Sequence, residues 1–157
     1  MRIAVIADTH DFCPAELPSR LRGADEIWHL GDVGDAQLLA DLGRPGSPVH
    51  VVAGNCDAPD AWPAELTLER EGWRFYLTHI PPSHAPVNAT TVLHGHTHVP
   101  RDEVIDGVRW LNPGSVSYPR GGLPPSFAWL TVTAQQIVSW SVVPLVDPRS
   151  GRRPIAG

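Results

Sequence analysis

Buried strands that end in polar side chains are the feature that most restricts the fold of this chain. Residues 2–7 are apolar from Ile3 onward and lead directly into Asp8, Thr9 and His10. A continuous apolar run of this length is typical of a strand that other elements cover on both faces. In open α/β sheets, ligands bind at the carboxyl ends of the strands, so Asp8 and His10 become candidate site residues. The alternative for Asp8 is the cap of a following helix.

The same succession of strand and polar group occurs twice more. Residues 26–30 are followed by Gly31 and Asp32, and residues 48–53 are followed by Gly54 and Asn55. His29 lies inside its strand, where a core histidine, or one that supports a ligand, is expected. Three such strands predict a sheet with several polar groups along one edge.

The remaining residues predict further strands and two short helices. A short helix and turn, interrupted by Pro14 and Pro18, are expected over residues 11–23, and a second helix is expected over residues 35–42, between a capping Asp35 and Gly43. Strands are expected over residues 65–70, 73–78, 90–93, 104–105, 108–111, 127–133 and 137–143. Helical crossovers therefore dominate the first half and hairpins the second. We predict an α/β fold in one domain over residues 1–143, followed by a C-terminal tail over residues 144–157.

Three histidines stand within five residues at the end of another β-branched run. They are His94, His96 and His98. Neutral imidazole binds first-row transition ions, and residues two apart on an extended segment project to the same side. His96 and His98 are therefore candidate ligands, and the alternative is a group of unrelated surface histidines.

Charge and cysteine content exclude several classes of protein. The net charge of −5 and the lack of Lys and Arg runs argue against an extended nucleic-acid footprint. Cys13 and Cys56 form neither a disulfide framework nor a CxxC pair, which predicts reduced thiols and a cytoplasmic location. The apolar run after Arg2 is too short for a signal or membrane-spanning segment, so no membrane association is expected.

The predicted strand ends together supply mixed nitrogen and oxygen donors. These donors are Asp8, His10, Asp32, Asn55, His79, His96 and His98. Seven donors exceed what one tetrahedral ion needs and suit two ions that share a carboxylate. The mixture accepts Mn, Fe, Co, Ni or Zn, of which we expect Mn first. The sequence thus predicts two divalent ions with open coordination positions for water and substrate.

Five sequence blocks follow one another in a fixed order. They are Asp8-Thr9-His10, Gly31-Asp32, Gly54-Asn55, His79 and Gly95-His96-Thr97-His98. In this order they resemble the calcineurin-like metallophosphoesterase superfamily, and residues 112–115 resemble a loop of its small prokaryotic phosphodiesterases. The resemblance implies two stacked mixed sheets flanked by helices, a four-layer αββα sandwich. It also implies that Asp8, His10, Asp32 and His98 hold one ion and that Asp32, Asn55, His79 and His96 hold the other.

The resemblance further implies hydrolysis of small phosphodiesters by a water that bridges two ions about 3.5 to 4 Å apart. Catalytic roles fall to Asp32, the shared ligand, and to Asn55 and His96. Asp57 is expected to orient ligands rather than to bind an ion. Cys56 stands where many members have a proton-donating histidine, although the small phosphodiesterase branch commonly has cysteine there. Because a thiol with a pKa of about 8.5 is a weak acid catalyst near neutrality, we expect Cys56 to be a packed neighbour of the site.

The loop after His79 departs from the family. Ile80, Pro81 and Pro82 stand where the family usually has glycine, so the substrate contacts of this loop are expected to differ. The prolines predict a stiff loop. His84 in the same loop is an alternative proton donor, or else an ordinary solvated histidine.

Other functions are compatible with parts of the sequence. A non-catalytic scaffold of the eukaryotic vesicle coat resembles this fold but lacks some ligand histidines, whereas all seven positions are filled here. The histidine cluster also resembles that of metallo-β-lactamase-type hydrolases, but Val99 and Pro100 stand where that family has Asp-His. Trp110, Trp129 and Trp140 in or near the late strands fit core packing and leave a homo-oligomer interface as a further expectation.

Overall fold

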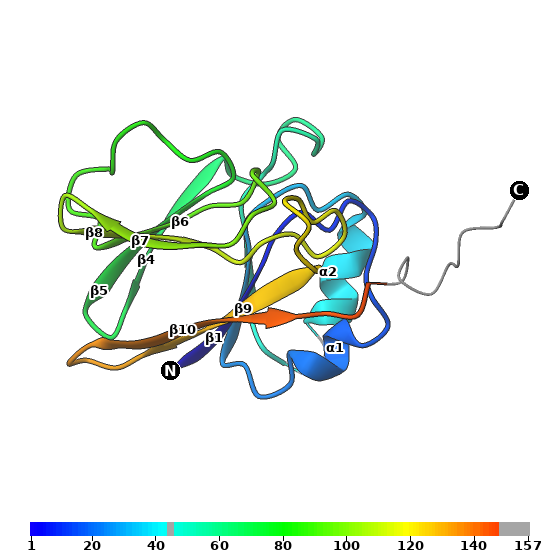
Figure 1. The fold of residues 1–157 in the computed structure, drawn as a ribbon, viewed down its shortest axis with the longest axis horizontal. Coiled ribbons are helices and arrows are strands. Elements are labelled where there is room, and N and C mark those ends of the chain that lie inside the picture. Colours follow the sequence, from blue (N-terminus) through cyan, green and yellow to red (C-terminus); the bar gives the residue numbers. More distant parts are fainter. Residues whose placement is uncertain (44–45, 148–157) are drawn as a thin grey trace, which may run out of the picture.

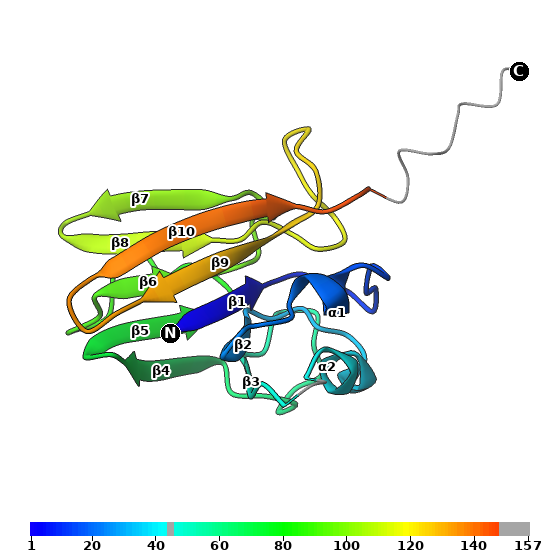
Figure 2. The ribbon, with the colours of Figure 1, turned by 90° about the horizontal axis from the view of Figure 1, so that it is seen from below.

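The computed structural model describes residues 1–43 and 46–147, which form two stacked five-stranded sheets (Figure 1, Figure 2). The first sheet, in the order β10-β9-β1-β2-β3, consists of β1 (Arg2–Ile6), β2 (Glu26–His29), β3 (Val49–Val51), β9 (Ser126–Val132) and β10 (Ile137–Pro144). The second sheet, in the order β4-β5-β6-β8-β7, consists of β4 (Glu65–Arg70), β5 (Trp73–Thr78), β6 (Thr91–Leu93), β7 (Arg101–Ile105) and β8 (Val108–Asn112). Both sheets mix parallel and antiparallel pairs, which confirms the predicted α/β sandwich of mixed sheets.

The predicted strands agree with the observed ones to within two residues at each end, except in β7. The sequence predicts only residues 104–105 of this strand, which begins at Arg101. Its first three residues are charged, and four of its five residues are exposed. Because β7 lies at the edge of its sheet, its charged residues obscure the apolar alternation that marks a strand.

Two short helices are described, α1 (Leu17–Arg20) and α2 (Ala36–Leu42). α2 begins as predicted, because the side chain of Asp35 caps it by accepting a backbone N–H at 2.9 Å. The short helix predicted within residues 11–23 is α1, and the prolines limit its length. Pro18 lies in the first turn of α1, and a helix that began earlier would place this proline, which has no N–H to donate, in its interior. Neither described helix is long and apolar enough to cross a membrane.

Two apolar cores lie on opposite faces of the first sheet. One fills the space between the sheets, where the rings of Trp28 and Phe75 meet edge to face at 5.3 Å. The other lies between the first sheet and the helices and contains Leu17 and Leu42. Both described helices therefore cover the outer face of the first sheet. In the described part of the chain, the second sheet carries no helix on its outer face, where the predicted four-layer arrangement has one.

A loop lies over the second sheet in place of that helix. Residues 80–90 connect β5 to β6, and their three prolines remove backbone donors that a helix interior needs. A cavity of about 410 Å³ lies between this loop and the β7–β8 hairpin, with His84, Arg101 and Trp110 in its wall. This connection thus leaves part of the sheet face open.

The described chain ends in contact with the fold. Leu145, which follows β10, is buried in the core beneath the helices, and its N–H donates to the Pro125 carbonyl at 2.7 Å. The first residues of the expected tail therefore pack on the domain. Residues 148–157 of that tail lie outside the described residues.

The parallel strands bring the predicted polar groups to neighbouring positions. β1 pairs in parallel with β2, β2 with β3, and β5 with β6. Backbone hydrogen bonds continue beyond the strand ends, from Asp8 N–H to the Gly31 carbonyl and from Gly95 N–H to the His79 carbonyl, each at 3.0 Å. The polar segments that follow these strands are therefore held side by side.

Candidate metal centre

The structure brings all seven predicted ligands together, from the segments that follow β1, β2, β3, β5 and β6. Each has a side-chain nitrogen or oxygen within 4.0 Å of another member of the set. Two groups can be distinguished within this cluster. We call them the Asp8 half (Asp8, His10 and His98) and the Asn55 half (Asn55, His79 and His96).

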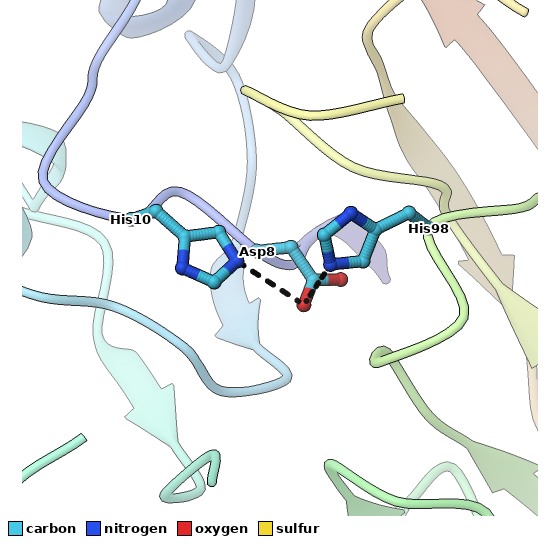
Figure 3. Close-up of side chains that lie close together, drawn as sticks. All are labelled: Asp8, His10 and His98. Atoms are coloured by element: carbon cyan, nitrogen blue, oxygen red, sulfur yellow. Dashed lines mark ion pairs between the residues drawn. The ribbon is translucent and has the colours of Figure 1, made fainter. Parts of the chain in front are cut away.

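In the Asp8 half, a carboxylate lies between two imidazoles (Figure 3). Asp8 Oδ1 is 3.3 Å from His98 Nε2 and 4.0 Å from His10 Nε2. Asp8 is fully buried, and neither of its carboxylate oxygens has a hydrogen-bond partner among the described residues. The same is true of His10 Nε2. A buried carboxylate is costly unless it is paired or binds a cation, so these side chains fit a metal ion.

In the Asn55 half, an amide oxygen lies between two imidazoles. Asn55 Oδ1 is 3.0 Å from His79 Nε2 and 3.0 Å from His96 Nδ1. His79 is buried, His96 is half-buried and Asn55 is exposed. This half therefore offers an amide oxygen and two imidazoles, a donor set that suits an ion of the borderline type.

Asp32 lies between the two halves. Its Oδ2 is 3.6 Å from His10 Nε2 and 3.2 Å from His79 Nε2. Its other oxygen, Oδ1, accepts the backbone N–H of Cys56 at 2.8 Å. One carboxylate oxygen is thus fixed by the backbone, and the other faces both halves.

Backbone carbonyls orient two of the histidines. His79 Nδ1 lies 2.7 Å from the Leu30 carbonyl, and His98 Nδ1 lies 2.6 Å from the Tyr118 carbonyl. Because a carbonyl only accepts, each Nδ1 carries a proton, which leaves Nε2, on the side of the carboxylates, as the ring atom that can bind a metal ion. Both rings are therefore held in the orientation that a metal ligand needs.

Comparison with known proteins identifies the family to which the chain belongs. Residues 1–135 match the model of the calcineurin-like phosphoesterase superfamily domain. The chain belongs to this superfamily. It is 32% identical to phosphodiesterase YfcE of Escherichia coli strain K12, over 83% of this chain and 87% of that relative. It is 27% identical to the probable metallophosphoesterase YsnB of Bacillus subtilis, over 84% of this chain and 85% of that relative.

Solved structures share the sandwich. The phosphoesterase YfcE from E. coli superimposes with a TM-score of 0.72 and 27% identity, over 90% of this chain and 98% of that chain. Vps29 of Entamoeba histolytica, complexed with Zn²⁺, gives a TM-score of 0.74 at 20% identity, over 92% of this chain and 98% of that chain. The second likeness shows the fold alone. The predicted membership of the phosphoesterase superfamily and its sandwich fold are thereby confirmed.

The cluster of seven predicted ligands lies on strained backbone. Five of its seven residues have positive φ: Asp8 (55°), His10 (46°), Asp32 (53°), His96 (66°) and His98 (60°). Residues other than glycine seldom adopt this left-handed region, and such conformations concentrate at functional sites. The fold therefore retains several costly conformations at the positions where the ligands are predicted.

Asp57 connects two of the loops that carry predicted ligands. Its Oδ1 accepts the backbone N–H groups of Val33 at 2.8 Å and Gly34 at 3.0 Å, and its Oδ2 accepts that of Gly54 at 2.8 Å. Asp57 thereby links the segment after β2 to the segment after β3. Both of its oxygens are used by backbone donors, which leaves its carboxylate engaged with the loops.

Two buried histidines have partners outside the ligand cluster. His29 Nε2 lies 2.9 Å from Thr9 Oγ1, and its Nδ1 accepts the Gly31 N–H at 3.2 Å. His94 Nε2 lies 3.1 Å from a guanidinium nitrogen of Arg101. Burial lowers the pKa of His29 to about 3 and that of His94 to about 4, so both rings are neutral. These contacts agree with the expectation that neither histidine is a ligand.

The two alternative proton donors lie in different places. Cys56 is exposed, so the prediction that it is packed is wrong, but it does lie beside the site. Its Sγ is one of three potential ligand atoms, with those of His10 and Asp32, that lie within 4.8 Å of one another. Desolvation, followed by the charge of Asp32, raises the pKa of the Cys56 thiol. His84 lines the cavity over the second sheet, whose wall includes none of the seven predicted ligands.

The loop after β8 makes contacts that the sequence did not predict. The hydroxyls of Ser115 and Ser117 donate to the Asp8 carbonyl at 3.0 and 2.8 Å. The Tyr118 carbonyl orients His98, as described above. The similarity of residues 112–115 to a phosphodiesterase loop points to this segment. It gives no sign that the segment joins residues more than a hundred positions away.

Proposed function

We propose that this chain is a phosphodiesterase that hydrolyses small phosphodiesters with two divalent metal ions, of which Mn²⁺ is expected first. The observation that carries the proposal is the fully buried Asp8 carboxylate, which two imidazoles face and which has no hydrogen-bond partner among the described residues. The names of the relatives, a phosphodiesterase and a probable metallophosphoesterase, support the same class of reaction.

The predicted ligands are assigned to two metal ions. Asp8, His10, Asp32 and His98 are assigned to one ion, and Asp32, Asn55, His79 and His96 to the other. When bound, such a pair activates a water and neutralises charge on the phosphoryl oxygens. Asp32 faces both halves and thereby sets their spacing. Asn55 and His96, on the more exposed side, are the ligands that an entering phosphate meets first.

Protonation of the leaving group receives little help from Cys56. Its raised pKa makes the thiol a reluctant proton donor, although it lies beside Asp32. Esters whose leaving groups are themselves acidic therefore suit this site. A nitrophenolate leaving group meets that requirement.

The proposal is tested with protein loaded with Mn²⁺ and bis(p-nitrophenyl) phosphate as substrate. We expect hydrolysis by the wild type and its loss in Asp32→Ala and in His98→Ala, with circular dichroism to verify folding. His84→Ala is the matched control, because it removes an imidazole outside the ligand cluster. Full activity in either ligand variant contradicts the assignment.

A non-catalytic metal-binding scaffold is the second candidate, because the fold is shared with Vps29 at a TM-score of 0.74. The two candidates differ in one measurement. Calorimetry that detects Mn²⁺ binding, together with a phosphodiester screen that detects no hydrolysis, favours the scaffold. Hydrolysis that depends on Asp32 excludes it.

The proposal also covers the location and the assembly of the protein. Cys13 and Cys56 are free cysteines, which suits the reducing cytoplasm. Trp129 and Trp140 are only partly buried and pack at the margins of the two cores, so part of each remains available to a second copy of the chain. Sedimentation that shows only monomer at micromolar concentration contradicts a homo-oligomer.

A further inference from the structure

We infer that the two sides of the ligand cluster receive the two organic groups of a phosphodiester: a planar group against Tyr118 and a compact apolar group in a depression beside Asn55 and His79. This inference rests on the proposed function and names the substrate class more closely. It assigns specificity to residues that are not metal ligands.

Tyr118 forms the wall on the side of the Asp8 half. Its ring lies 5.4 Å from the His10 ring, centroid to centroid, at an interplanar angle of 77°. Tyr118 is 53% exposed, so a large part of this residue faces solvent beside a candidate ligand. Aromatic rings stack on or meet other planar groups with favourable energy, which makes this surface suited to an aryl group or a nucleobase.

The Tyr118 backbone is fixed at both polar groups. Its N–H donates to Ser115 Oγ at 2.9 Å, and its carbonyl accepts from His98 Nδ1 at 2.6 Å. Arg120 follows in the same loop, and its N–H donates to the His98 carbonyl at 3.3 Å. The ring therefore extends from a backbone segment that is tied directly to the metal centre, so binding does not have to order this segment.

A shallow depression of about 280 Å³ forms the other side. Its wall includes Asn55 and His79 of the ligand cluster together with the apolar side chains of Ala53, Ala64 and Ile80. Ile80 is 51% exposed, although it is one of the large apolar residues of the chain. It stands in the stretch after His79 where the sequence departs from the family pattern. An apolar ester group would cover this exposed surface.

The position of the two sides favours a diester over a monoester. One side adjoins the Asp8 half and the other adjoins the Asn55 half, with Asp32 between the halves. A phosphoryl centre held between them carries two organic groups in a diester and only one in a monoester. A diester can therefore contact both sides at once, whereas a monoester can contact one.

Binding of two phenyl esters tests this inference. Calorimetry with Mn²⁺-loaded protein measures the Kd of diphenyl phosphate, a sluggish diester, and of phenyl phosphate, the matched monoester. Tyr118→Ala removes one wall, and Ala64→Phe fills the depression. We expect each variant to weaken diphenyl phosphate binding roughly tenfold, and at least one of them to leave phenyl phosphate binding unchanged. Tyr118→Phe and Ala40→Phe, the latter on the exposed face of α2, are expected to match the wild type.

The outcomes separate this inference from the proposed function. If either variant binds diphenyl phosphate like the wild type, if both weaken the two esters equally, or if the wild type does not bind the diester, the inference is overturned. Mn²⁺ affinity, measured in parallel, is expected to be unchanged in all four variants. Absence of bis(p-nitrophenyl) phosphate hydrolysis by the wild type, with the expected binding pattern intact, would contradict the proposed reaction and leave the two ester sites supported.

Discussion

The two halves of the ligand cluster differ in burial and in charge. In the Asp8 half, Asp8 and His98 are 0% and 7% exposed, and the set includes a carboxylate of its own. In the Asn55 half, an exposed neutral amide takes the place of that carboxylate. Attraction between an ion and a carboxylate is stronger where solvent does not screen it. We therefore expect the Asp8 half to hold its ion tightly and the Asn55 half to admit solvent and substrate.

The two halves share the Asp32 carboxylate, so they cannot act independently. Asp32 faces one imidazole from each half, His10 at 3.6 Å and His79 at 3.2 Å. His79 Nε2 also lies 3.9 Å from Asp8 Oδ1. An ion in one half therefore changes the electrostatic environment of the other. The difference between the halves is one of degree, and removal of single ligands measures it.

Removal of one ligand from each half has the largest expected effect. Asp8→Ala deletes the only carboxylate of its half and is expected to weaken Mn²⁺ binding there by at least about 100-fold, with loss of hydrolysis. Asn55→Ala deletes a neutral donor next to solvent and is expected to weaken the second ion by about tenfold. Calorimetry and metal analysis after dialysis measure both, with His84→Ala as control. Equal losses in the two variants would show that the halves are equivalent.

Two glycines lie so close to the carboxylates of the cluster that their substitution tests how tightly each region is packed. A Cβ at Gly54 would overlap the carboxylate and backbone nitrogen of Asp32, whereas a Cβ at Gly95 would lie 3.1 Å from Asp8 Oδ2. We expect Gly54→Ala to lower the free energy of unfolding by about 3 kcal/mol and Gly95→Ala by about 1 kcal/mol. Urea denaturation in the presence of chelator separates this effect from metal binding. A larger loss in Gly95→Ala would contradict the packing seen around Asp32.

Metal binding is also expected to stabilise the fold through Asp8. An ion compensates the charge of its buried carboxylate, which lacks hydrogen-bond partners among the described residues. Saturating Mn²⁺ is therefore expected to raise the Tm of the wild type by about 5 to 10 °C. Asp8→Ala is expected to show a much smaller rise, because only the Asn55 half remains complete. Thermal scans with and without chelator provide the measurement, and the same rise in both proteins would argue against this role of Asp8.

The positions of the predicted ligands could be read from the sequence because the signal is local. Asp8 and His79 each follow directly or closely on an apolar strand, and parallel pairing places such strand ends together. The tight turn at Glu71-Gly72 is equally local, and both residues have the positive φ that such a turn requires. Assignment of ligands to separate ions came from resemblance to a family, since spacing alone does not sort seven donors into two groups.

No local sequence pattern indicated the contacts between distant segments. Tyr118 reaches His98 because β8 lies beside β6, and Ser115 reaches Asp8 from the other sheet, so both contacts depend on the completed fold. The connection over the outer face of the second sheet is a further detail that the resemblance alone does not determine. Resemblance implied a helical layer there, but the connection between β5 and β6 is a loop with three prolines. Local composition in this case overrides the family pattern.

The smallest expected effect concerns Cys56, which lies beside the carboxylate that joins the two halves. Its backbone N–H, rather than its thiol, holds Asp32 Oδ1 at 2.8 Å, so a side-chain substitution preserves this contact. Because the pKa of the thiol is raised, Cys56 stays protonated between about pH 6 and 8 in the metal-free protein and contributes no change of charge there. We expect Cys56→Ser to keep kcat/KM for bis(p-nitrophenyl) phosphate within about threefold of the wild type, with the same pH profile over that range. A loss beyond tenfold at unchanged Mn²⁺ affinity would instead identify the thiol as the proton donor, and would give the exposed side of the centre a catalytic group that its neutral ligands lack.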